Sequence, residues 1–150
     1  MRRAIELALE NVSTGRGGPF GAVVVRGETI IAEGTNQVTS SNDPSAHAEM
    51  VAVRAACRAL ANFQLAGCEV YSSCEPCPMC LGLIYWARPD KVFYGVTAED
   101  AAAIGFDDSF IYRELQLPRS ARSIPMAQML RDDALVAFRT WQQKPDKTPY

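Results

Sequence analysis

The feature that most constrains this chain is a pair of short motifs that can share one metal ion. His47-Ala48-Glu49 contains the only histidine among the 150 residues, and Pro76-Cys77-Pro78-Met79-Cys80 supplies two thiols further along. One imidazole and two thiolates are three ligands that suit zinc, and they leave its fourth tetrahedral position open. An open position admits a water molecule, which distinguishes a catalytic zinc from a closed structural one. The fold of this chain must therefore bring the two motifs to one point.

A redox pair or a structural zinc finger would account for fewer of these residues than a catalytic zinc site does. A C-x-x-C pair can belong to either, and Cys74-Glu75-Pro76-Cys77 overlaps the first pair, which leaves open which thiols bind metal. A redox pair has no use for His47 or Glu49, and a structural finger needs a second knuckle that is absent here. We therefore expect His47, Cys77 and Cys80 to hold a catalytic Zn²⁺. The remaining cysteines are expected to be small buried side chains: Cys57, Cys68 and Cys74.

Length and composition are those of one soluble domain. The chain has 48% hydrophobic residues and a formal net charge of −2, so it carries no basic footprint for nucleic acid. No apolar run reaches the ~18 residues of a membrane span, and the N-terminus has no signal-peptide pattern. Five cysteines are an odd number without a paired framework, which favours a reducing cytoplasm. We expect a single cytoplasmic domain over residues 1–150, with neither nucleic acid nor membrane as a partner.

The periodicity of apolar residues predicts helices that alternate with buried strands. An amphipathic pattern predicts a helix over residues 1–13, and two β-branched runs around Gly27-Glu28 predict a hairpin. The hairpin strands are expected at 22–25 and 29–32, further strands at 68–72 and 90–95, and further helices at 44–61, 77–86, 99–104 and 126–141. This order indicates an α/β sandwich with a mixed sheet. The helix at 77–86 is so apolar that we expect it to be buried on all sides.

The two motifs are expected at helix N-termini. Asp43-Pro44 offers an N-cap and a first helical residue just before the histidine motif. His47 and Glu49 are two positions apart, so they can converge only near a helix start. Cys77 and Cys80 share one face of their own helix, whose N-terminus also stabilises thiolates. Both helices follow strands, and open α/β sheets place their sites at the carboxyl ends of strands.

Hydrolytic deamination is the chemistry that this arrangement favours. An H-x-E stretch followed by P-C-x-x-C is similar to the signature of zinc-dependent nucleobase deaminases. A zinc-bound water would have a pKa lowered to ~7. Glu49, which is not needed as a ligand, would take a proton from that water, pass it to a ring nitrogen and protonate the leaving ammonia.

Beyond the zinc motifs, the chain resembles the bacterial guanine deaminases, a group within the cytidine and deoxycytidylate deaminase superfamily. The resemblance covers nearly the whole chain. Its matching stretches are residues 17–23, 33–36, 41–44, 47–49, 73–80, 84–89 and 105–112, and the terminal Tyr150. The zinc stretches are shared across the superfamily, whereas the Gly-Phe-Asp-Asp-Ser-Phe loop at 105–110 and Tyr150 are more specific to this group.

The resemblance implies a three-layer α/β/α sandwich around a five-stranded mixed sheet, a homodimer, Zn²⁺ as cofactor, and conversion of free guanine to xanthine and ammonia. It also implies His47, Cys77 and Cys80 as zinc ligands and Glu49 as proton shuttle. Contacts to the base are implied for Phe20, Asn36, the Ala48 backbone, Asp108 and Tyr150. In similar enzymes the C-terminal segment can be exchanged between protomers and cover the partner's site. We expect residues 142–150 to form such a tail, although two prolines in 144–149 depart from the family pattern.

Three other functions remain open at this point. A tRNA adenosine deaminase shares both zinc stretches but should carry a basic surface, against which the net charge and Asp107-Asp108 argue. A deaminase of another aminated heterocycle, such as isocytosine, cytosine or a triazine, is also consistent, because guanine and isocytosine present the same amide-amidine edge. A structural zinc-binding module without catalysis leaves Glu49 and the open metal position without a role.

Overall fold

A computed structural model describes residues 1–150. It divides into two compact units, Met1–Ile111 and Tyr112–Tyr150. The first unit contains the whole sheet, and each unit is described by itself below.

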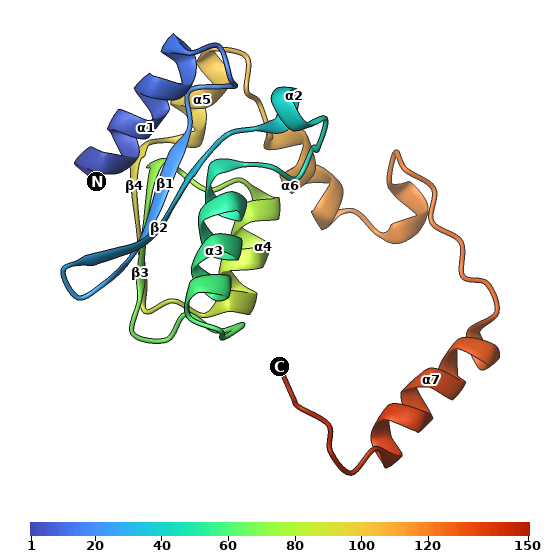
Figure 1. Cartoon of the computed structure of the whole chain (residues 1–150). Helices are drawn as coiled ribbons and strands as arrows, with labels where there is room; N and C mark the ends of the chain where they lie inside the picture. The colour runs from blue at the N-terminus through green and yellow to red at the C-terminus, as the bar shows by residue number, and fades with distance from the viewer. The chain divides into compact units, whose positions relative to one another are not determined.

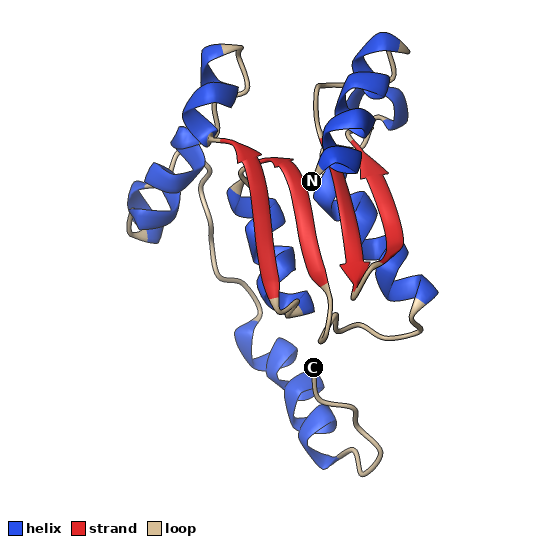
Figure 2. Cartoon of the chain, turned by 90° about the vertical axis from the view of Figure 1, so that its left-hand side faces the viewer, coloured by secondary structure: helices blue, strands red, loops and turns tan.

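The sheet of the first unit has four strands: β1 (Gly21–Arg26), β2 (Thr29–Thr35), β3 (Glu69–Cys74) and β4 (Lys91–Val96). Their spatial order is β2-β1-β3-β4 (Figure 2). The predicted hairpin is confirmed, because β1 pairs antiparallel with β2 and Arg26 lies opposite Thr29. Gly27 in the connecting turn has φ +59°, a conformation that favours glycine. Since β1 is antiparallel to β3 and β3 is parallel to β4, the predicted mixed sheet is also confirmed.

Helices cover both faces of this sheet and give three layers (Figure 1). Helix α1 (Arg2–Ser13) packs on β1, while α3 (Ala48–Ala59) and α4 (Pro78–Ala87) cover the opposite face. Gly21 permits the close approach of α1, because a Cβ at that position would lie 2.3 Å from the Ala4 carbonyl oxygen. The main core lies between the sheet and α3. It consists of Ala22, Val24, Ala48, Ala52, Val53, Ala56, Leu65, Cys68, Val70 and Ala87.

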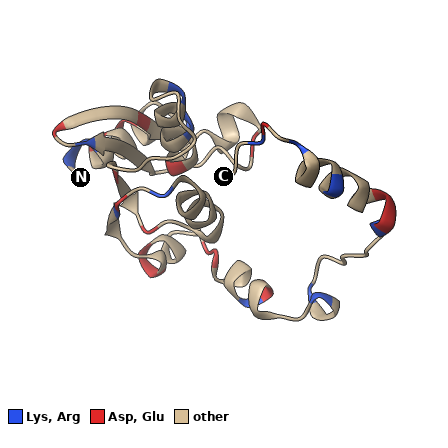
Figure 3. Cartoon of the chain, turned by 90° about the horizontal axis from the view of Figure 1, so that it is seen from below, with Lys and Arg blue, Asp and Glu red and all other residues tan.

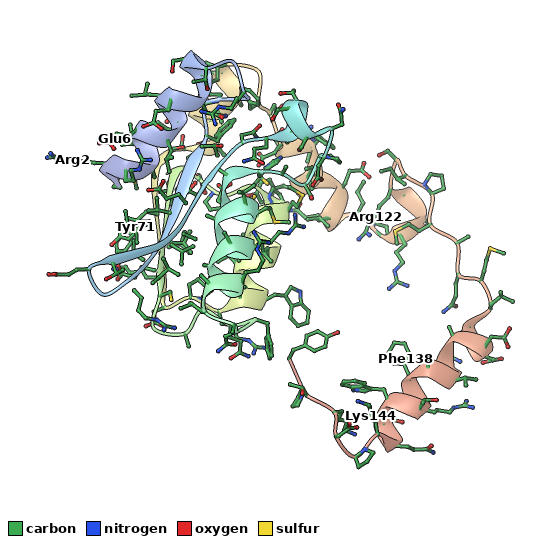
Figure 4. All side chains as sticks on the ribbon, viewed as in Figure 1. Arg2, Glu6, Tyr71, Arg122, Phe138 and Lys144 are labelled. Carbon is green, nitrogen blue, oxygen red and sulfur yellow. The ribbon has the colours of Figure 1, made fainter.

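Two short helices, α2 (Val38–Ser41) and α5 (Ala98–Ala103), follow the ends of β2 and β4. A capping box holds the start of α5, in which Thr97 accepts from the backbone N–H of Asp100 and Asp100 accepts from that of Thr97. The sheet face that α1 covers also carries a stacked pair of rings, Tyr71 of β3 and Phe93 of β4, with centroids 4.7 Å apart. Figure 4 labels Tyr71 on this side of the sheet.

The expectation of a fifth strand is wrong. The sheet ends at β4, and the chain after Val96 forms α5, α6 (Ser109–Gln116) and then irregular backbone. Pro118 and Pro125 interrupt this later segment, and a proline cannot donate an N–H to a sheet ladder.

The helix of the histidine motif begins later than expected. Helix α3 starts at Ala48, and His47 takes the N-cap position with extended backbone, φ −70° and ψ 156°. Asp43 does not cap this helix, because its Oδ1 accepts hydrogen bonds from the Ser45 backbone N–H at 2.8 Å and the Ser45 hydroxyl at 2.7 Å. These bonds close a local turn around Pro44. The helix therefore begins only after this turn, with His47 as its N-cap.

Two further expectations about helices are corrected. Helix α4 is not buried on all sides, because Tyr85 and Trp86 are 75% and 61% exposed. The last helix, α7 (Arg131–Gln143), starts at Arg131 instead of residue 126. Leu130 stands before it with φ +49°, outside helical backbone.

The second unit holds most of α6, a single 3₁₀ turn at Arg119–Ala121 and α7. Arg122 folds the connecting segment by donating to the carbonyl oxygens of Leu115 and Leu117, and the Ser123 N–H donates to Glu114 Oε2 at 2.8 Å. Helix α7 buries none of its residues, and Phe138 remains 71% exposed (Figure 4). None of the helices in the chain is both long and apolar enough to cross a membrane.

Candidate active site

The two motifs meet as predicted, at one end of the sheet. The ligand atoms that His47, Cys77 and Cys80 can offer all lie within 4.8 Å of one another. His47 is the N-cap of α3 and Cys77 is the N-cap of α4, with a proline at the start of the latter helix. The helix starts place all three side chains at the edge where β3 and β4 end. One imidazole and two thiols at this spacing fit a zinc ion with one open coordination position.

The protonation of the two thiols differs. Cys77 Sγ lies 3.5 Å from His47 Nδ1. A hydrogen bond from Cys80, together with the one from His47, lowers the pKa of Cys77 to about 4. The pKa of His47 is raised, chiefly by its hydrogen bond to Cys77, and that of Cys80 is raised by its hydrogen bond to Cys77 and by burial. These directions favour the thiolate form at Cys77 over Cys80, and a bound metal would displace the proton that remains on the pair.

Cys74, the other cysteine of the overlapping pair, is not in this group. It is buried, and burial raises its pKa to about 11. Its Sγ lies 3.8 Å from the Thr97 carbonyl oxygen. The geometry thus leaves Cys74 outside the group of side chains that could hold a metal ion.

Glu49 lies beside the ligand group without belonging to it. Its side chain is buried, and its two oxygens have different partners: Oε1 accepts from the Ser72 hydroxyl at 2.8 Å, and Oε2 accepts from Cys80 Sγ at 3.4 Å. Burial raises the pKa of Glu49 above the usual range of a carboxyl group. A raised pKa makes the carboxylate a stronger base, which suits a group expected to take a proton from water.

A cavity of about 600 Å³ opens in front of these residues. Three of the predicted base contacts, Phe20, Asn36 and Asp108, line it together with His47, Glu49 and Cys77. Its lining includes four carboxylates and no lysine or arginine; the acidic residues are Glu49, Glu75, Asp107 and Asp108. Desolvation raises the pKa of Asp108, and the negative charge of Cys77 raises it further. Such a cavity suits ligands with N–H donors and disfavours phosphate groups.

Two of the aromatic rings that line the cavity pack against each other. Phe20 packs edge-on against Phe106, with ring centroids 4.9 Å apart and an interplanar angle of 88°. Asn36 is almost fully buried, and its backbone N–H donates to the Phe20 carbonyl oxygen at 3.1 Å. Its side-chain Oδ1 lies 3.4 Å from the Val38 N–H. The amide of Asn36 can therefore present its donor side to a planar ligand held by the two rings.

Sequence reasoning missed Asn11, which supports this side of the cavity from behind. Its side-chain amide donates to the carbonyl oxygens of Gly18 at 2.9 Å and Asn36 at 2.8 Å. A signal was present, because Asn11 continues the buried stripe of α1, in which the other members are apolar: Ala4, Leu7 and Ala8. A polar residue in such a stripe needs a buried partner.

One predicted base contact of the first unit, Ala48, is not among the residues that line the cavity. Ala48 is fully buried, and its carbonyl oxygen faces Gly34. Tyr150 belongs to the second unit. Their contacts with a base, like the roles of the other site residues, stay predictions.

Comparisons with known proteins agree with the geometry of the site. The family model for the cytidine and deoxycytidylate deaminase zinc-binding region matches residues 1–96. The guanine deaminase of Bacillus subtilis (strain 168) is 54% identical over 150 residues, which are 100% of this chain and 96% of that protein. The X-ray structure of the B. subtilis enzyme has a TM-score of 0.96, with 99% of this chain and 95% of that chain covered.

More distant relatives include enzymes with different substrates in their names. A guanine deaminase from Nitrosomonas europaea has a TM-score of 0.68 at 31% identity, covering 93% of this chain and 80% of that chain. The tRNA-specific adenosine deaminase of Haemophilus influenzae is 34% identical over 136 residues, which are 87% of this chain and 78% of that protein.

Proposed function

This chain belongs to the cytidine and deoxycytidylate deaminase family, and on that premise we propose that it is a guanine deaminase that hydrolyses free guanine to xanthine and ammonia. The observation that carries the proposal is the similarity to the B. subtilis guanine deaminase, which extends over the whole chain and not only over the zinc motifs. The acidic cavity, without any lysine or arginine, supports a neutral base as the substrate rather than a phosphate-bearing one.

In the proposed mechanism His47, Cys77 and Cys80 hold the zinc, which when bound supplies Lewis acidity that makes water nucleophilic near neutral pH. Glu49 takes a proton from the attacking water and delivers it to a ring nitrogen of the base. The water oxygen bonds to the carbon that carries the exocyclic amine. Glu49 then transfers the second water proton to that amine, the C–N bond breaks and ammonia leaves. One water proton thus ends on the ring and the other on ammonia, and Glu49 returns to its starting state.

Asp108 is the proposed reader of the guanine edge. An ionised carboxylate only accepts hydrogen bonds, so it suits the N–H groups of guanine and cannot pair with an edge of acceptors. A site built on such a bond rejects analogues that would leave the buried group unpaired. Phe20 and Phe106 would flank the flat base, and Asn36 and the Ala48 backbone are the proposed polar contacts beside Asp108.

The test is ammonia release from a panel of guanine, isocytosine, cytosine, an amino-triazine, adenine and an RNA hairpin that contains adenosine. We expect guanine to be the best substrate. Asp108→Asn should then lower kcat/KM for guanine by about 10²-fold or more, because one of the two acceptor oxygens is replaced by a donor and the negative charge is lost. A wild-type protein that prefers adenine or the RNA would contradict the proposal. A preference for isocytosine would change the proposed substrate to a smaller ring that presents the same edge.

An RNA substrate receives no support from the charge distribution. Lysine and arginine residues fall on separate elements of the ribbon, interspersed with aspartates and glutamates (Figure 3). The formal net charge of −2 points the same way, because proteins that neutralise phosphates need an excess of basic residues.

We further infer that the chain forms one deaminase domain over residues 1–150 and works as a cytoplasmic homodimer, with residues 142–150 as a tail that closes an active site. Five free cysteines support a reducing compartment. Helix α7 supports association, because it buries none of its residues. A 13-residue helix is marginal on its own in water and gains stability by packing an apolar face against another surface. The second copy of this chain is the proposed surface.

A further inference from the structure

Ser72 is a polar side chain inside the core that the proposed mechanism has not yet used. It lies on β3, opposite Ala22 of β1, and is 1% exposed. Its hydroxyl donates to Glu49 Oε1 at 2.8 Å, a bond between two buried groups from different layers of the fold. This hydrogen bond therefore links β3 of the sheet to the first turn of α3.

The bond fixes how the Glu49 carboxylate is turned. A serine hydroxyl has a single hydrogen to donate, and here it is directed at Oε1. Oε2 then lies on the side of the ligand group, 3.4 Å from Cys80 Sγ. Glu49 also lines the cavity, so its second oxygen is the one with access to both the metal ligands and a bound base. Without the hydroxyl, nothing on β3 would hold the carboxylate in this rotation.

We propose that Ser72 is a positioning residue that holds Oε1 of Glu49 and thereby makes Oε2 the oxygen that carries protons from water to the base and to the leaving amine. This inference rests on the proposed function. The proton that Oε2 removes from water is the one it delivers to the ring nitrogen, and the second follows the same route to the amine. Oε1 keeps the Ser72 hydrogen bond throughout, so Ser72 exchanges no proton.

The neighbouring residue offers a matched control. Successive side chains of a strand point to opposite faces of the sheet. Ser73 is also buried, but its Oγ accepts from the Gly21 N–H at 3.0 Å and has no bond to Glu49. Ser73→Ala removes a buried hydroxyl from the same strand and leaves the carboxylate of Glu49 in place.

The experiment compares Ser72→Ala, Ser72→Thr and Ser73→Ala with wild type in the zinc-loaded protein. It measures kcat and KM for guanine, zinc per chain, the thermal midpoint and the affinity for the product xanthine. We expect Ser72→Ala to lower kcat by about 10- to 100-fold, the usual effect of removing a group that orients a reacting one. KM, xanthine affinity and zinc content should remain within about twofold of wild type, because the base and the ligands keep their contacts. Ser72→Thr retains the hydroxyl and should restore most of kcat, whereas Ser73→Ala should lower the thermal midpoint without lowering kcat.

Three results would overturn the inference. The first is a wild-type kcat in Ser72→Ala, and the second is an equal loss of kcat in Ser73→Ala, which would indicate a general effect of loosening β3. The third is a fall in zinc content that parallels the loss of kcat. If Ser72→Ala does not fold, Ser72→Cys decides. Its slightly larger thiol fills the site but donates only weakly, so a wild-type kcat there contradicts the proposal. A zinc-loaded wild-type protein that releases no ammonia from guanine would instead overturn the proposed function itself.

Discussion

At the scale of single residues, Glu49 combines burial with two hydrogen-bond partners that approach different oxygens. Replacing it with alanine removes the proposed proton shuttle but none of the three proposed ligand atoms. We therefore expect Glu49→Ala to retain one zinc per chain and the wild-type thermal midpoint, while kcat falls by about 10²- to 10⁴-fold, the range attributed to general acid–base catalysis. Metal analysis, a melting curve and ammonia release measure the three quantities. Full activity in this variant, or an active wild type without zinc, would contradict the role of Glu49 and the metal together.

Asn11 is the second residue whose contribution can be isolated. Its amide satisfies two buried carbonyl oxygens, so Asn11→Ala should lower the free energy of unfolding by about 1–3 kcal/mol. It should also raise KM for guanine, because the backbone of Asn36 and the loop before Phe20 lose a common support. Denaturant melts and steady-state kinetics measure these effects.

Asn11→Asp is the comparison that separates lost packing from lost hydrogen bonding. A carboxylate has nearly the same shape but would face two carbonyl oxygens with no hydrogen to donate. We expect Asn11→Asp to be less stable than Asn11→Ala. If Asn11→Asp is instead the more stable variant, the hydrogen bonds that Asn11 donates to Gly18 and Asn36 do not stabilise this part of the fold.

At the scale of elements, the position of α3 depends on one close approach to β2. A Cβ added at Gly34 would lie 2.3 Å from the Ala48 carbonyl oxygen and 2.6 Å from the Ala52 backbone nitrogen. Backbone atoms cannot rotate away as a flexible side chain can, so Gly34→Ala must push α3 off the sheet. We expect the free energy of unfolding to fall by about 1–3 kcal/mol, and zinc affinity to fall with it, because His47 sits at the start of the displaced helix.

Gly82 provides the control for this prediction. It lies within α4, and a Cβ there would meet nothing within 4 Å. Gly82→Ala should raise the free energy of unfolding by about 0.5–1 kcal/mol through helix propensity and leave zinc affinity unchanged. If both variants behave alike, close packing at Gly34 is not what places α3.

Elements with strong local signals were predictable from the sequence. The hairpin was, because the β-branched runs and the Gly27 turn are contiguous in sequence, and the convergence of His47 with Glu49 followed from their spacing at a helix start. The start of α3 was not, because Asp43 can use the same carboxylate oxygen for a helix cap or for a turn with Ser45, and local sequence does not separate the two. Tyr85 of α4 was expected to be buried for a related reason: an apolar run predicts burial without showing whether a neighbour covers every face.

Within the site, the candidate metal ligands were predictable from the sequence, whereas the residues that position their neighbours were not. The chain has one histidine and few cysteines, so the histidine and the C-x-x-C pair could be recognised from the sequence as ligands of one metal site. Ser72 is an ordinary residue in a strand, and only the three-dimensional pairing with Glu49 gives it a function. The fifth strand was expected from resemblance, and no strand pattern in the residues after Val96 supported it.

At the scale of the whole molecule, the C-terminal tail is the part whose role most needs a test. Deleting Lys147 to Tyr150 should leave zinc content and the thermal midpoint nearly unchanged, because these residues are exposed. Turnover of guanine should fall, since a site that the tail no longer closes admits water and weakens the interactions of Asp108. Wild-type kinetics in the truncated protein would show that the tail takes no part.

Exchange of the tail between subunits can be tested by mixing two inactive chains, one with Glu49→Ala and one truncated after Asp146. If the tail covers the partner's site, the mixed dimer contains one site with an intact Glu49 and an intact tail from the other chain, and activity returns. If each tail covers its own site, every site keeps one defect and the mixture stays inactive. Native mass spectrometry of the mixture, which separates the three dimers by mass, confirms that mixed dimers have formed.

The order of the site residues along the chain has a consequence for how such enzymes diversify. The three proposed metal ligands, Glu49 and Ser72 all precede Val96, the last residue of the sheet, as do the proposed base contacts Phe20, Asn36 and Ala48. Two other proposed base contacts, Asp108 and Tyr150, come after it. Mutations confined to the last third of the gene can therefore alter two of the proposed base contacts without replacing a proposed metal ligand. For protein engineering, libraries confined to residues beyond the sheet should yield new substrates at a low rate of metal loss.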